Sequence, residues 1–145
     1  MLLDGEDVSE QIRTQEVSTL ASRASALPSV RQALLAMQRQ VGKHGGVVVE
    51  GRDIGTVVFP HAAAKFFLTA SVEERASRRF NELKERDAEL TLEQVKEDVR
   101  ERDKRDTMRP VAPLQQAEDA VVIDSTKFSI DQVVDQIVRR VRELA

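Results

Sequence analysis

Arginine and aspartate are concentrated in two short stretches of this 145-residue sequence. Gly51-Arg52-Asp53-Ile54-Gly55-Thr56 places opposite charges and two glycines directly after a short apolar run. Residues 100–109 carry Arg102, Asp106 and Arg109 at i, i+4 and i+7, so a helix would place them on one face. A guanidinium is always charged and presents a planar fork to phosphate oxygens. Both stretches therefore point to a small anionic ligand.

A third group, Arg75, Arg78 and Arg79, shares one helix face at i, i+3 and i+4. Like charges at this spacing repel one another unless an anion is bound. The alternative for every charged stretch is a solvated face of ion pairs, and Arg52 and Asp53 could simply pair with each other. That alternative fits Glu101, Asp103 and Lys104.

The composition excludes several classes of protein and site. Acidic residues exceed basic ones, the net charge is −3 and the few aromatic residues are all Phe, so we expect no nucleic-acid partner. The absence of cysteine excludes disulfides, thiolate zinc sites and cysteine nucleophiles. No apolar run approaches the ~18 residues of a membrane span, and no leader is visible, so we expect a cytoplasmic protein with no membrane partner.

Short apolar runs alternate with helical patterns along the chain. The runs typical of strands buried on both faces are 47–49, 65–68 and 120–123. The segments with helical periodicity or capping patterns are 14–41 (broken at Leu27-Pro28), 71–84, 91–106 and 129–144. Near the start, Asp4-Gly5 is a hairpin signal, but the first arm has only three residues, so we expect either only a turn or a hairpin whose partner strand is cut off. This order predicts an α/β fold with a ligand site at the carboxyl ends of parallel strands.

A Walker A loop, G-x-x-x-x-G-K-[ST], does not occur in this sequence. Gly46 and Gly51 have the required spacing, but Arg52 and Asp53 stand where Lys and Ser or Thr belong. The residues between these glycines also read as a strand, not a loop. We therefore expect no phosphate-binding loop of this type within the 145 residues.

Residues 51–60, Gly-Arg-Asp-Ile-Gly-Thr-Val-Val-Phe-Pro, resemble a signature of bacterial cytidylate kinases. These enzymes transfer the γ-phosphoryl group of ATP to CMP or dCMP, giving CDP or dCDP. Further matching stretches occur in order: Ile12-Arg13-Thr14, Pro28-Ser29-Val30-Arg31, Arg102-Asp103-Lys104-Arg105-Asp106 with Arg109, Val111-Ala112-Pro113-Leu114 and Ile123-Asp124-Ser125-Thr126. His61 departs from the family, which usually has Asp there.

The resemblance implies roles for individual residues. The residues matching the contacts to the CMP phosphate, and so the catalytic set, are Arg52, Arg102 and Arg109. Asp106 matches the residue that binds the ribose hydroxyls, and the matches to the cytosine readers are Ser22, Arg31 and Asp53. Arg75 and Arg79 match the lid (about 75–91) that closes over the ATP phosphates. Mg²⁺ would accompany ATP, and no metal ligand is assigned in this chain.

The resemblance also implies a nucleoside-monophosphate-kinase sheet with strand order 2-3-1-4-5. It covers the last two-thirds of the family, so strands 1 and 2 and the Walker A loop would be absent from this chain. Residues 1–45 would be a remnant of the CMP-binding insert with connecting helices, and 46–145 the C-terminal part of the kinase core. The strand around 47–50 then lacks its partner. It could pair with the strand at 65–68, self-association could cover it, or the chain could fold poorly alone.

Three functions remain open at this stage. The first is a cytidylate kinase, for which we expect the 145-residue chain to be inactive alone because it has no Walker A loop. The second is a non-catalytic CMP-binding or interaction fragment that needs a separate N-terminal portion. The third, a nucleic-acid binder using residues 100–109, is disfavoured by the net charge and by the absence of Tyr and Trp.

Overall fold

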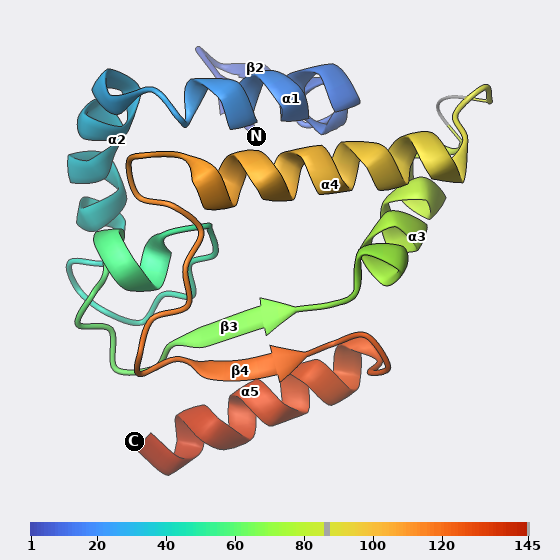
Figure 1. Ribbon diagram of the computed structural model, residues 1–145. Helices are drawn as coiled ribbons and strands as arrows, with labels where there is room; N and C mark the ends of the chain where they lie inside the picture. The colour runs from blue at the N-terminus through green and yellow to red at the C-terminus, as the bar shows by residue number, and fades with distance from the viewer. Residues whose placement is uncertain (86–87, 145) are drawn as a thin grey trace. The chain divides into compact units, whose positions relative to one another are not determined.

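The computed structural model describes residues 1–85 and 88–144 and is drawn in Figure 1. The chain divides into two compact units, Met1–Val47 and Val48–Ala145, which are described separately. Among these described residues, the first unit contains a small hairpin and two α-helices, and the second contains a parallel strand pair with three α-helices. None of the described helices has the length and apolar character needed to cross a lipid bilayer.

The N-terminal unit begins with the hairpin that Asp4-Gly5 predicts. Strand β1 (Leu2–Leu3) pairs antiparallel with β2 (Glu6–Asp7). Asp4 and Gly5 have φ angles of 50° and 88°, the positive values that a tight two-residue hairpin turn requires. The alternative of an isolated turn is therefore wrong.

Two helices follow in this unit, after a short 3₁₀ turn at Gln11–Arg13. Helix α1 (Gln15–Ala24) begins at Thr14, whose hydroxyl accepts a hydrogen bond from the backbone of Val17. Helix α2 (Pro28–Val41) starts with proline in its first turn, and Leu27 before it is extended. The predicted break at Leu27-Pro28 is confirmed, because proline disfavours helical backbone at the residue before it.

The C-terminal unit is built on two parallel strands. Strand β3 (Phe66–Thr69) lies beside β4 (Val121–Asp124), with Phe66 opposite Val121 and Leu68 opposite Ile123. Figure 1 shows the two arrows running in the same direction. This pair confirms two of the three predicted strands, each shifted by one residue, and the small parallel sheet of an α/β fold.

The third predicted strand, over residues 47–49, is wrong. Residues 46–51 form neither helix nor strand, and Val48 is fully exposed. Among the described strands, β3 hydrogen-bonds only to β4, so the suggested pairing of residues 47–50 with 65–68 does not occur. A run of valines favours extended backbone, but a strand also needs a neighbouring ladder to accept its hydrogen bonds.

Three helices complete the C-terminal unit: α3 (Val72–Leu83), α4 (Leu92–Met108) and α5 (Ile130–Leu144). The side chain of Ser71 caps α3, and Thr91 forms a reciprocal capping box with Gln94 at the start of α4. Helices α3 and α4 pack together, and α4 extends two residues beyond its predicted end. Ala76 and Leu83 on α3 and Val95 on α4 are buried apolar residues.

Candidate functional site

A single π-helical turn, η2 (Ile54–Val58), follows Asp53. The backbone N–H groups of Val57 and Val58 donate to the carbonyl of Asp53 at 2.8 and 3.2 Å. Such turns are rare and are frequent at functional sites. Gly51 permits this geometry, because a Cβ there would lie 2.7 Å from Cγ1 of Ile54. The turn thus fixes the backbone that carries Asp53, and no pattern in the sequence predicts it.

Arg52, Asp53, Arg102, Asp106 and Arg109 form a group of charged side chains that we call the α4 cluster, and the last three come from helix α4 and its C-terminal end. Asp106 is 3% exposed and Arg109, where the helix ends, is 8% exposed. Arg102, Asp106 and Arg109 lie on one helix face, as their spacing predicts. The Arg109 side chain turns into the protein, where its Nε donates to the carbonyl of Ala112 at 2.6 Å.

Two carboxylates join this helix to the segment before the π turn. Asp106 accepts a hydrogen bond from Nε of Arg52 at 2.8 Å and lies 3.8 Å from Nε of Arg102. Asp53 Oδ1 lies 3.6 Å from Nη2 of Arg109, and both side chains are at least nine-tenths buried. The structure thus brings together five predicted site residues from two segments about fifty positions apart. Arg52 pairs with Asp106 and Asp53 with Arg109, so the alternative in which the neighbours Arg52 and Asp53 pair with each other is wrong.

Positive charge is in excess within this cluster. Burial lowers the pKa of the Arg102 guanidinium, and the nearby charges of Arg52, Arg79 and Arg105 lower it further, against the opposing effect of Asp106. Arg105 was not predicted as a site residue, although its spacing from Arg102 and Arg109 offered a signal. Its Nε is buried with no hydrogen-bond partner among the described residues. Guanidinium groups crowded in this way are stabilised by an anion.

The predicted lid arginines are held by groups of the protein itself. Arg75 forms a bidentate ion pair with Asp103, with two N···O distances of 2.7 Å, and its Nε donates to the carbonyl of Ala70. Arg79 pairs with Glu82 at 3.1 Å. The expectation that like charges on this face require an anion is therefore wrong. Carboxylates of the protein neutralise the positive charges, and a backbone carbonyl accepts a hydrogen bond from Arg75.

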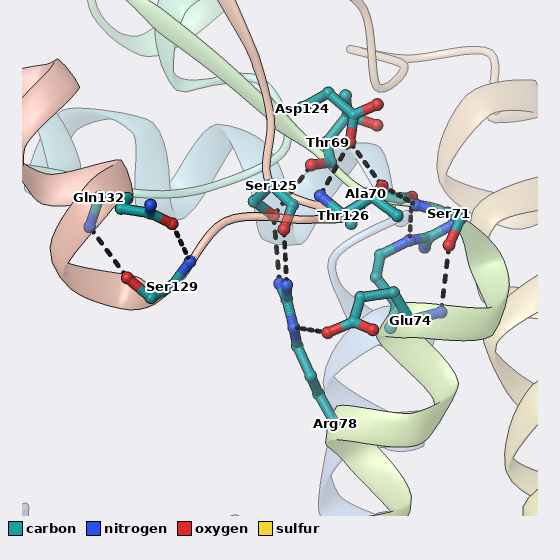
Figure 2. A network of polar contacts seen from close by, with 11 residues as sticks. Thr69, Ala70, Ser71, Glu74, Arg78, Asp124, Ser125, Thr126, Ser129 and Gln132 are labelled. Carbon is teal, nitrogen blue, oxygen red and sulfur yellow. Dashed lines mark hydrogen bonds and ion pairs between the residues drawn. The ribbon is translucent and has the colours of Figure 1, made fainter.

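Arg78 ties α3 to the loop that follows β4, as Figure 2 shows. Its Nη1 and Nη2 donate to the hydroxyl and carbonyl of Ser125 at 3.1 and 2.7 Å, and its Nε donates to Glu74 at 2.7 Å. The Ser125 hydroxyl in turn donates to the carbonyl of Thr69 at 3.0 Å. These hydrogen bonds lie at the carboxyl ends of β3 and β4, where the sequence predicts a ligand site, and they join both strand ends to α3.

Ser22 and Arg31 belong to the N-terminal unit. Ser22 is 7% exposed, and its buried hydroxyl has no hydrogen-bond partner within residues 1–85 and 88–144. Nη1 of Arg31 donates to the carbonyl of Ser25, whose hydroxyl donates to the carbonyl of Ser22. One chain of hydrogen bonds thus joins Ser22 and Arg31, and that they act with the α4 cluster stays a prediction.

Comparison with known proteins decides the family. The model of the family described as Cytidylate kinase matches residues 1–143. This chain belongs to the cytidylate kinase family. Its relatives include proteins named Cytidylate kinase from Syntrophotalea carbinolica, 56% identical over 99% of this chain, and from Colwellia psychrerythraea, 53% identical over 94%. The chain spans about 61% of the length of each of these relatives.

Cytidylate kinases are nucleoside-monophosphate kinases that generally use Mg²⁺ with ATP. In the described parts of the chain, no group of three or more His, Asp or Glu side chains could hold a metal ion. The two carboxylates of the cluster already face guanidinium groups, Asp106 that of Arg52 and Asp53 that of Arg109. These residues therefore do not fit a magnesium ligand set.

We expect the ion pair between Arg75 and Asp103 to contribute modestly to the stability of this chain. The two side chains are 35% and 32% exposed, and partly exposed ion pairs contribute ~0.5–1 kcal/mol. Asp103→Asn should lower the free energy of unfolding by about that amount, measured by urea denaturation. A double-mutant cycle with Arg75→Gln provides the control, because the coupling between the two sites should equal most of the loss. A coupling of zero would contradict this role.

Proposed function

We propose that the protein transfers the γ-phosphoryl group of ATP to CMP or dCMP, and that the α4 cluster binds the nucleoside monophosphate. Family membership supports the reaction, and the observation that carries the site is the convergence of Arg52, Arg102 and Arg109 on two buried carboxylates. Phosphoryl transfer depends mainly on positioning and on charge stabilisation. Three guanidinium groups supply both for a phosphate.

In this proposal the acceptor nucleotide is held at three points. Arg52, Arg102 and Arg109 bind the CMP phosphate, and Asp106 accepts hydrogen bonds from the ribose hydroxyls. Asp53 reads cytosine, which offers an amino donor at N4 and acceptors at N3 and O2, and Ser22 and Arg31 are assigned to the base by the family resemblance alone. Uracil reverses the donor and acceptor at two of these positions, so a carboxylate discriminates against it. Arg75 and Arg79 act at the lid, residues 86–87 of which lie outside the described residues.

The same family resemblance assigns the segments and strands of the chain to parts of the kinase. We assign residues 1–45 to the CMP-binding insert with its connecting helices, and residues 46–145 to the C-terminal part of the kinase core. In the family order 2-3-1-4-5, β3 and β4 would be strands 4 and 5. The exposed apolar side chains of Leu68 and Val122 on these strands favour self-association, and a cytoplasmic location stays an expectation.

Calorimetric titration of the 145-residue chain tests the proposal. Binding is the suitable readout, because no Walker A loop occurs in this sequence and we expect no turnover by this polypeptide alone. CMP and dCMP should bind saturably, and UMP at least roughly tenfold more weakly. Absence of CMP binding by a chain whose folding circular dichroism confirms, or equal affinities for CMP and UMP, would overturn the proposal.

A further inference from the structure

Lys65 is a buried cation that has no part in the proposed contacts to CMP. Its side chain is 7% exposed. Nζ donates to Oδ1 and Oδ2 of Asp119 at 2.9 and 2.8 Å and to the carbonyl of Pro60 at 2.5 Å. An ammonium group has three N–H donors, and three oxygens surround this one. The charge is therefore compensated in a specific geometry.

The three contacts of Lys65 join three segments of the C-terminal unit. Pro60 lies two residues after the π turn η2, Asp119 lies two residues before β4, and Lys65 directly precedes β3. The Lys65 carbonyl also accepts a hydrogen bond from the backbone of Val121 at 2.9 Å. Its main chain is thus held by the sheet while its ammonium group reaches the end of the turn.

The alkyl part of the side chain also contacts the π turn. A Cβ added to Gly55, the second residue of the turn, would lie 3.4 Å from Cδ and 3.7 Å from Cγ of Lys65. The methylene groups therefore pack against the glycine backbone. The same turn accepts its first hydrogen bonds at the carbonyl of Asp53. Lys65 thus supports, along one side and at the end, the turn that fixes the Asp53 backbone.

The exposure of the Asp119 carboxylate indicates that its ion pair with Lys65 positions nearby residues more than it stabilises the whole fold. The Asp119 side chain is 64% exposed, and its hydrogen bond with Lys65 lowers its pKa. An ion pair with one exposed partner contributes little to the free energy of unfolding. A displacement of about 1 Å at a binding residue, by contrast, can change recognition strongly.

We propose that Lys65, held by Asp119 and Pro60, is a positioning residue for base recognition, because it supports the turn that orients Asp53. This inference rests on the proposed function, in which Asp53 reads cytosine. Without the contacts of the Lys65 ammonium group the turn shifts, and the Asp53 carboxylate accepts a weaker hydrogen bond from the cytosine amino group. Selectivity for CMP over UMP should then fall, while the fold persists.

Lys65→Met tests the inference, because methionine keeps an unbranched side chain against Gly55 but loses the three donors. Calorimetry should show the ratio of CMP to UMP affinity falling by roughly tenfold, mainly through weaker CMP binding. Lys104→Met, which removes an exposed lysine charge on α4, is the matched control and should leave the ratio unchanged. A merely structural role would lower the melting temperature of Lys65→Met and leave the ratio of the folded protein intact.

Asp119→Asn provides a second test at an exposed position, and it decides the outcome if Lys65→Met does not fold. It should reduce the same ratio severalfold in the same direction. If the folded variants keep a ratio of CMP to UMP affinity within twofold of that of the unsubstituted chain, the inference is overturned. If the unsubstituted chain itself shows no preference for CMP, the proposed function fails first, so the two failures are distinguishable.

Discussion

Replacing Arg109 with glutamine should lower the free energy of unfolding by about 3 kcal/mol or more. The Arg109 side chain is 5% exposed, its Nη2 lies 3.6 Å from the buried Asp53 carboxylate, and its Nε donates to the Ala112 carbonyl at 2.6 Å. Removing one partner of a buried ion pair leaves the other charge desolvated, which typically costs ~3–5 kcal/mol. Urea denaturation at neutral pH measures the loss.

The same substitution should weaken CMP binding far more than cytidine binding, since we assign Arg109 to the phosphate. A reduction in CMP affinity of roughly a hundredfold is expected for one charge-assisted contact of ~3 kcal/mol. Lys104→Gln is the control, because it removes the same charge from an exposed position on the same helix and should change stability by no more than ~0.5 kcal/mol. A folded Arg109→Gln chain with unchanged stability and CMP affinity would contradict both roles.

Asp53→Asn should reverse much of the preference for cytosine. Asp53 is 8% exposed and is held by the backbone hydrogen bonds of the π turn, so its side chain has little freedom to adapt. A carboxylate only accepts hydrogen bonds, whereas a carboxamide also donates, which suits the O4 acceptor of uracil. We expect the ratio of CMP to UMP affinity to fall by roughly a hundredfold, measured by calorimetric titration.

The matched control for this variant is Asp135→Asn, at an exposed position on α5 that removes the same charge. It should leave both affinities unchanged. If Asp53→Asn folds and keeps the preference of the original chain, the assignment of Asp53 to the base is wrong. Loss of CMP and UMP affinity by the same factor would instead assign Asp53 to holding Arg109.

Local rules predicted most of the helices and the turn at the N-terminus. The capping residues Ser71 and Thr91, the break at Leu27-Pro28 and the positive φ at Asp4-Gly5 depend on neighbours within a few positions. Such interactions can be read from adjacent residues. The same holds for the face of α4 that carries Arg102, Asp106 and Arg109, because helix periodicity alone decides it.

Features that depend on distant residues could not be predicted in the same way. Residues 47–49 have the composition of a strand but pair with no described strand. The π turn that follows Asp53 was also not predicted. The acceptors for Arg75 and Arg78, Asp103 and Ser125, lie 28 and 47 positions away. Spacing along the chain carries no information about such partners.

The amino-acid sequence by itself determined the family, most helix boundaries and the identity of the charged residues, because these depend on residue type and on neighbours along the chain. The tertiary structure decided which charges meet. Asp106 pairs with Arg52 and Asp53 with Arg109, while Lys65 reaches Asp119 across 54 positions. The physical reason is that a buried charge needs partners of opposite charge or polar groups close to it, and only folding brings such distant residues together.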